Sequence, residues 1–232
     1  MAILLAFYLL MNIFASVKYC SILKSIAMDA QPKITLSGVL SEGISIGIKN
    51  LASLIVASLL WLVTIWIPYL NVGTTIAMST IPIELSKGKV ISPLFIFDAK
   101  YRKYMGEYFT LKGMMWMAIL PASLFVIIPG MIISLGWSLA LFILLDKGVA
   151  PGEAMIRSNK ATYGYKWTIF GVGFVLNVLF VILALILFKI PHIGILLVFL
   201  LAVVLMVARL GCNAVIYRNL AGNETTEEAT EI

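Results

Sequence analysis

Two ionisable residues of this chain stand out because of their apolar surroundings. Glu84 and Arg209 lie within long apolar stretches, where a charge is costly and tends to be kept for a function. If the two side chains met, they would form a charge pair at the inner mouth of a helical bundle and act as a gate or a brace. The alternative is that both side chains reach the lipid head groups and have no further role.

A second group of polar residues carries no charge. Asn71, Thr75 and Ser79 recur every four residues, which places them near one face of a helix. Such a face is suited to line a water-filled path for ions or small solutes, and it is also suited to pack against another helix through small hydroxyl groups. Packing is the preferred interpretation, because membrane bundles commonly use hydroxyl residues in this way.

The remaining reactive residue types do not predict an enzyme. His192 is the one histidine, and it has no second histidine, cysteine or carboxylate beside it to complete a metal site. Cys20 and Cys212 lack the number and spacing of a disulfide framework or a zinc site, so we interpret them as free thiols or small apolar residues. We therefore predict a non-enzymatic protein with no catalytic residue, no metal and no cofactor.

The composition indicates that the elements holding these residues lie in a membrane. Hydrophobic residues make up 62% of the 232 residues and charged residues 12%, against about 45–50% and about 25% in soluble domains. An apolar run of about 20 residues is long enough to cross the hydrocarbon core as a helix. The net charge of +6 does not indicate nucleic-acid binding, because no basic patch with interleaved aromatics lies on a polar domain.

Seven spans are expected, and the fold class predicted from them is an all-α, polytopic transmembrane bundle. Six of them form three hairpins, since the two runs of each hairpin meet at an Ile-Pro step, and proline disfavours a continuous helix. The first run lacks a basic segment before it, which favours a retained span over a removed signal peptide. The expected spans are residues 3–22, 50–67, 70–86, 112–128, 130–146, 166–188 and 193–216.

This pattern divides the chain into an N-terminal span with a cytoplasmic linker, a six-span domain and a disordered acidic tail. The similar spacing of the turn prolines predicts a threefold internal repeat, although any series of short hairpins would give a similar spacing. Lys49, Lys112 and Lys166 stand at the entry to successive hairpins and are expected to anchor them at the membrane surface. The boundaries are 1–36 for the first part, 37–90, 91–147 and 148–222 for the hairpins, and 223–232 for the tail.

The basic residues also predict an orientation. Fourteen of the seventeen Lys and Arg residues lie in the long connections 18–49, 87–112 and 147–166. Basic residues of short loops stay on the cytoplasmic side, so these connections and the C-terminus are expected inside and the proline turns outside.

Two of these connections are expected to be helical. Residues 94–108 mix aromatic and basic side chains, as a helix lying in the membrane interface does. In residues 151–160, Ala154 and Ser158 fall on one side of a helix. Glu153 and Arg157 fall on another side, four residues apart, where they are expected to pair.

A family resemblance appears at the last of these connections. Asp146, Pro151, Glu153-Ala154, Ser158, Gly164 and Lys166-Trp167, with an Ile-Pro-Gly turn at 128–130 and the closing Tyr217-Arg218-Asn219-Leu220, resemble the pattern of a broad family of bacterial six-span membrane proteins. That family includes the membrane domain attached to some glycerophosphodiester phosphodiesterases. The resemblance covers roughly residues 37–222. It implies a multi-pass protein of the bacterial cytoplasmic membrane and carries no catalytic residue to this chain.

These observations favour a helical bundle that acts by self-association or by binding another membrane protein or membrane lipids. Nucleic acid is not expected as a partner. The alternative function is an oligomeric channel or passive permease for ions or small solutes, with the Asn71, Thr75 and Ser79 face as its lining. A pore would lie between subunits, because so few helices leave little room for one inside a single chain. An enzyme acting on lipid would need catalytic groups from another chain.

Overall fold

A computed structural model describes residues 34–125, 127–190 and 193–222. All regular structure within these ranges is helical and no strand occurs there, which confirms the predicted all-α class. The predicted first span at 3–22, Cys20, His192 and the acidic tail at 223–232 lie outside the described residues.

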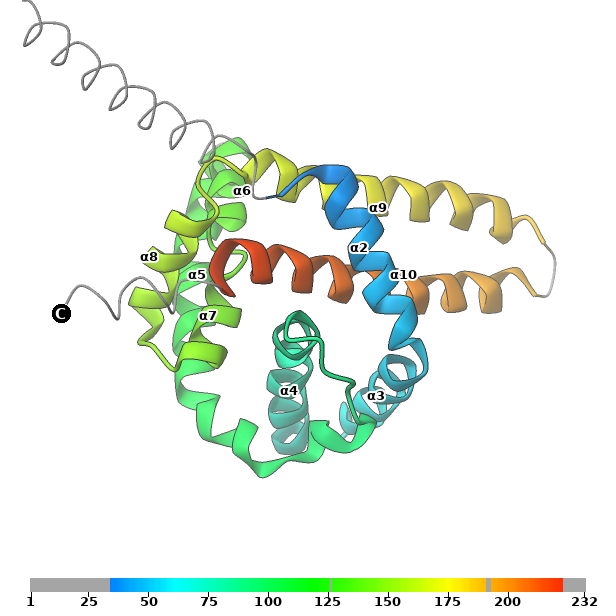
Figure 1. The fold of residues 1–232 in the computed structure, drawn as a ribbon, viewed down its shortest axis with the longest axis horizontal. Helices are drawn as coiled ribbons and strands as arrows, with labels where there is room; N and C mark the ends of the chain where they lie inside the picture. The colour runs from blue at the N-terminus through cyan, green and yellow to red at the C-terminus, as the bar shows by residue number, and fades with distance from the viewer. Residues whose placement is uncertain (1–33, 126, 191–192, 223–232) are drawn as a thin grey trace, which may run out of the picture. The chain divides into compact units, whose positions relative to one another are not determined.

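The described chain is a succession of helices whose lengths differ widely (Figure 1). Short 3₁₀ segments, η1 (Pro93–Phe97) and η2 (Ala99–Tyr104), precede α5, and the π-helical turn η3 (Arg218–Gly222) follows α10. The α-helices are α2 (Leu36–Lys49), α3 (Leu51–Thr64), α4 (Pro68–Ser86), α5 (Met105–Phe125), α6 (Ile127–Gly136), α7 (Ala140–Lys147), α8 (Pro151–Ala161), α9 (Lys166–Phe188) and α10 (Gly194–Tyr217).

Three helical stretches in the described ranges are long and apolar enough to cross a membrane. They are Ile127–Lys147, Lys166–Phe188 and Gly194–Gly222, and a fourth crossing is possible if α2 and α3, which meet at an angle of 76°, form one broken span. The helix α3, expected to cross alone, has only 14 residues, or about 21 Å at about 1.5 Å per residue. Six spans are therefore not confirmed, whereas a membrane protein is compatible with the structure.

The helix α2 lies in a region that was predicted to be part of the long connection 18–49. Thr35 caps its first turn, where its hydroxyl oxygen accepts a hydrogen bond from the backbone N–H of Gly38 at 3.2 Å. The helix packs across α10, and Figure 1 shows the two helices crossing. Glycines at the crossing allow the two backbones to come close together. A Cβ atom on Gly43 or Gly211 would overlap the backbone of the facing helix. Such close approach through small residues is typical of helix pairs in membranes.

Helices pack in pairs in the three regions where transmembrane hairpins were predicted, although the turns differ in detail. The first pair is α3 with α4, the second α5 with α6, and the third α9 with α10. Pro68 is the first residue of α4, as expected for the first turn position. Pro129 lies two residues inside α6, so the second turn comes earlier than 128–130. The arms of the three pairs have unequal lengths, and the threefold repeat stays a prediction.

The predicted helix at 151–160 is confirmed as α8, and it supports the break between α6 and α7. Its buried side chains are Ala154, Met155 and Ser158. The hydroxyl of Ser158 donates to the carbonyl oxygen of Gly136 at 2.7 Å and accepts from the N–H of Leu139 at 3.2 Å. Two backbone groups freed by the break thereby gain partners, which an apolar interior requires.

The expected single surface helix at 94–108 is wrong. The structure has η1 and η2 there, separated at Asp98, and α5 begins at Met105. Asp98 ends the first segment and starts the second, because its carboxylate accepts a hydrogen bond from the backbone N–H of Lys100 at 3.0 Å. Ile96 and Tyr101 are buried and fix this segment against the core beside α4.

Candidate functional site

A cavity of about 440 Å³ lies where five helices meet. Its walls come from α3, α4, α5, α7 and α10, together with the turn between α6 and α7. Most of the lining is apolar, and a small number of polar groups reach it. The lining includes Trp61, Thr75, Ser79, Lys112, Trp137 and Asn213.

Hydrogen bonds between α3 and α4 fix one wall of this cavity. The indole N–H of Trp61 donates to the hydroxyl of Thr75 at 3.0 Å. The hydroxyls of Thr64 and Thr74 form a second bond between the same helices at 2.8 Å. Ser79 donates to the carbonyl oxygen of Thr75 at 2.9 Å. The wall is therefore set before any ligand arrives.

Lys112 is the cationic group of the cavity lining. This lysine was predicted at the entry to a span, but α5 begins at Met105 and Lys112 lies within the helix. Its ammonium nitrogen lies 5.9 Å from the centre of the Tyr108 ring. Five of the six acidic residues in the described ranges form ion pairs with other Lys or Arg residues, and none of them pairs with Lys112. A cation half-buried among apolar groups without a carboxylate is suited to bind an anion.

Two of the three residues in the predicted polar face line the cavity. Thr75 and Ser79 do so, whereas Asn71 lies in the first turn of α4 and is not part of the lining. The side-chain nitrogen of Asn71 is buried without a hydrogen-bond partner among the described residues. Sequence reasoning missed Trp61, Trp137 and Asn213, because these residues come from other helices and only the fold brings them together.

The predicted pair of Glu84 and Arg209 is not formed in the structure. The carboxylate of Glu84 lies 3.0 Å from the ammonium of Lys89, beyond the end of the same helix. The guanidinium of Arg209 donates instead to the side-chain oxygen of Asn177 on α9. Each residue therefore has a nearer partner, one supplied by a loop and one by the neighbouring arm of the same hairpin.

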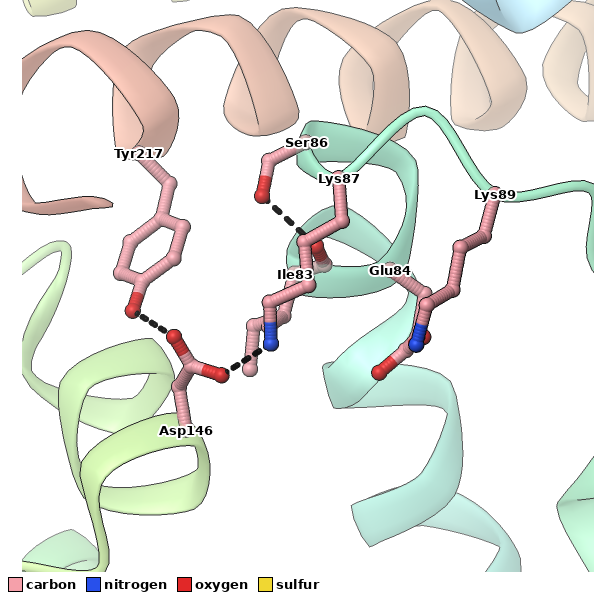
Figure 2. A network of polar contacts seen from close by, with 7 residues as sticks. All are labelled: Ile83, Glu84, Ser86, Lys87, Lys89, Asp146 and Tyr217. Atoms are coloured by element: carbon pink, nitrogen blue, oxygen red, sulfur yellow. Dashed lines mark hydrogen bonds and ion pairs between the residues drawn. The ribbon is translucent and has the colours of Figure 1, made fainter. Parts of the chain in front are cut away.

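A second polar arrangement joins the ends of α4, α7 and α10 (Figure 2). The carboxylate of Asp146 lies between two partners, the ammonium of Lys87 at 2.5 Å and the hydroxyl of Tyr217 at 2.6 Å. Asp146 and Tyr217 belong to the motifs quoted for the family resemblance, and the structure shows that they are in contact. Both carboxylate oxygens are engaged, so the arrangement serves to join the helices.

The other two predicted anchors occupy different kinds of position. Lys166 is the first residue of α9, as expected, and its ammonium lies 3.1 Å from the side-chain oxygen of Asn159. Lys49 is the last residue of α2, just before the bend into α3, rather than the start of a span. Cys212 is a buried free thiol, as expected.

Comparisons of the chain with protein-family models, curated proteins and solved structures found no match. The class of protein is therefore defined by the fold and the composition alone. It is an all-helical protein with helices that are able to cross a membrane, and it has a partly polar cavity between them.

Proposed function

We propose that this protein is a multi-pass protein of the bacterial cytoplasmic membrane that binds an anionic lipid without converting it. The observation that carries the proposal is the cavity in which Lys112 lies among tryptophan and hydroxyl side chains, without a carboxylate partner in the described ranges. The family resemblance supports the membrane location, and the asymmetric distribution of Lys and Arg supports a cytoplasmic C-terminus.

The chemistry of the lining matches an amphipathic anion. The indole rings of Trp61 and Trp137 offer large apolar surfaces, and the ammonium of Lys112 offers a charge for a phosphate group. Hydroxyl groups of Thr75 and Ser79 are available as hydrogen-bond acceptors or donors to the rest of a head group. The volume of about 440 Å³ lies in the usual range of ligand cavities, about 300–1,000 Å³, and holds a head group with the first part of a chain.

Native mass spectrometry of the detergent-extracted protein tests this proposal. Phosphatidylglycerol and phosphatidylcholine with identical chains are added in equal amounts, and bound lipid is counted. We expect wild type to prefer phosphatidylglycerol, and Lys112→Met to lower that preference about tenfold, equivalent to about 1.4 kcal/mol. Lys160→Met is the matched control, since Lys160 is exposed on α8 away from the cavity lining. An unchanged preference in Lys112→Met would exclude the proposed site.

The aromatic wall is tested separately. Trp137→Leu removes an indole from the cavity lining, whereas Trp116→Leu removes one that is 60% exposed on α5. We expect Trp137→Leu to reduce binding of both lipids and Trp116→Leu to leave it unchanged. Equal losses in the two variants would mean that the lipids bind at the outer surface of the bundle.

An oligomeric channel or permease is the second candidate function, and the position of Thr75 and Ser79 on the cavity wall favours it. In that case the cavity would be one part of a polar path completed by other subunits. Ion flux into liposomes, measured for wild type and for Thr75→Leu with Ser79→Leu, separates the two functions. Flux that is present in wild type and lost in the double variant supports the channel, and flux that survives rejects this lining.

A further inference from the structure

A charged side chain is held at the centre of the α9–α10 hairpin. The guanidinium of Arg209 donates to the side-chain oxygen of Asn177, whose side-chain nitrogen donates to the carbonyl oxygen of Gly173 at 2.8 Å. Asn177 is the middle residue of Lys166–Phe188, and Arg209 lies one residue from the middle of Gly194–Gly222. The amide thus holds the charge at mid-span, and Arg209 does not extend toward the helix end.

This polar pair lies on an exposed, otherwise apolar face. Both Asn177 and Arg209 are exposed, and the residues one turn to either side on α9, Phe174 and Val181, are 56% and 51% exposed. A helix as apolar as α9 belongs in hydrocarbon. A guanidinium at that depth without a counter-charge is strongly disfavoured, and such residues normally face a partner. For a side chain at the centre of a bilayer, the lipid phosphates are about 15 Å away, half of the hydrocarbon thickness.

Among the residues that the structure describes, no carboxylate forms an ion pair with Arg209. Residues 1–28 contain neither Asp nor Glu. Three acidic residues on or beside the packed helices form ion pairs with other residues. Glu42 pairs with Arg218, Glu84 with Lys89, and Asp146 with Lys87. The other acidic residues lie in polar connections, at the start of α5 or in the polar tail. A second copy of the chain would therefore bring another Arg209 and no matching charge.

We propose that the exposed face of α9 and α10 around Arg209 binds a membrane-spanning helix of a different protein, one that carries Asp or Glu at the middle of its span. The carboxylate forms an ion pair with the guanidinium that Asn177 holds in place. The apolar residues around the pair contact the rest of the partner helix and exclude lipid. This surface is separate from the cavity, whose lining includes neither Asn177 nor Arg209.

Energy transfer in phosphatidylcholine vesicles tests the proposal with defined probes. The full chain carries a donor dye, and synthetic polyleucine transmembrane peptides carry an acceptor and a single central Asp, Asn or Leu. We expect wild type to bind the Asp peptide about tenfold more tightly than the Leu peptide, with the Asn peptide between them. Arg209→Leu should bind all three peptides alike, and Arg209→Lys should retain a preference for Asp.

An exchange of charges distinguishes the loss of the ion pair from misfolding of the variant. Arg209→Asp should lose the Asp peptide and gain a peptide with a central Lys, an outcome that a misfolded chain would not give. Lys160→Leu is the control, since Lys160 is exposed on α8, and it should bind the Asp peptide as wild type does. Equal binding of Asp and Leu peptides by wild type would overturn the proposal. A second result would also overturn it. If two labelled copies show energy transfer without peptide, and Arg209→Leu abolishes this transfer, the partner is a second copy of the chain.

Discussion

At the scale of single residues, the contacts around Asp146 hold three helix ends together. Its carboxylate bonds with Lys87 and Tyr217, and the Tyr217 side chain is almost fully buried. Sequence reasoning marked Asp146 and Tyr217 only as parts of a motif. Their contact depends on how α7 and α10 pack, which no local pattern specifies.

Tyr217→Phe should therefore destabilise the protein. The substitution keeps the ring and removes the hydroxyl that donates to Asp146, and a hydrogen bond to a charged group contributes about 1.5–3 kcal/mol. Thermal unfolding in detergent, followed by circular dichroism, measures the loss. Tyr163→Phe is the control, because Tyr163 is 79% exposed. Similar melting of the two variants would show that the Asp146 contact contributes little.

Asp98, which lies outside the membrane-spanning stretches, is expected to make the stability of the fold depend on pH. The backbone N–H of Lys100 and its ammonium, 3.0 Å from the carboxylate, hold the pKa of Asp98 below its ordinary value of 3.8. A carboxyl with a lower pKa in the folded state stabilises the fold above its unfolded pKa, and this contribution disappears as the pH falls through the folded-state value. The melting difference between wild type and Asp98→Asn should be present near neutral pH and vanish in acid. A difference that grows in acid would contradict this sign.

An ion pair between residues close in the sequence was predicted correctly, whereas one between distant residues was not. The Glu153–Arg157 pair was predicted from its spacing of four and is confirmed at 2.6 Å, because helix geometry alone brings such residues together. The pair of Glu84 with Arg209 was predicted across two hairpins, and both residues have other partners. Arg209 bonds with the opposite arm of its own hairpin, at a depth that depends on how α9 and α10 are aligned.

At the scale of elements, α8 stabilises the break between α6 and α7. Ser158→Ala removes a buried hydroxyl that bonds with both Gly136 and Leu139. The carbonyl oxygen of Gly136 keeps the Thr162 hydroxyl at 3.1 Å, but the N–H of Leu139 loses its partner, which costs about 1–3 kcal/mol. We expect a clear decrease in melting temperature. Ser134→Ala is the matched control, since Ser134 bonds only with the carbonyl of Met131 in its own helix. Equal stability of the two variants would mean that α8 does not support the break.

The crossing of α2 and α10 makes a second prediction about elements. Gly211→Ala places a methyl group against the backbone of Gly43, so the helices must separate, and overpacking of this kind costs about 1–3 kcal/mol. Gly113→Ala is the control, because no atom lies within 4 Å of the added group and helix propensity favours alanine by about 1 kcal/mol. Melting measurements should move in opposite directions for the two variants.

The same crossing shows why α2 was missed. Its sequence contains Gly43 and Gly47, four residues apart with Thr35 as a possible cap, and these are the signals by which it could have been found. The apolar content of 36–49 is interrupted by Ser, Glu and Gly, so a search for long apolar runs passes over it. The glycines of α2 can be identified as a packing surface only when the helix that faces them is known.

At the scale of the whole molecule, composition and proline positions predicted the helical class and the pairing of arms. They did not predict the bend between α2 and α3 or the number of crossings, because α3 is too short to span by itself. Thr75 and Ser79, which were predicted to share a polar helix face, line the cavity, but the cavity itself was not predicted. Its tryptophans and the use of Lys112 depended on packing between helices distant in sequence.

The proposed orientation predicts opposite labelling of two loops. Single cysteines are placed at Lys89 and at Lys189 in a chain whose native cysteines are replaced, and intact cells are treated with a membrane-impermeant maleimide. In the proposed orientation the proline turn is outside and the long connection inside, so we expect labelling at position 189 without lysis and at position 89 only after lysis. Labelling of both positions in intact cells would reject the orientation.

The contacts of α10 with α2, α4 and α9 have a consequence for biosynthesis. Of the described helices, α10 is the last to leave the ribosome, so α2 and α4 are made before the helix on which they pack exists. Until then the glycine face of α2 has no partner from α10. A chain whose synthesis stops before residue 194 therefore lacks the helix on which α2, α4 and α9 pack.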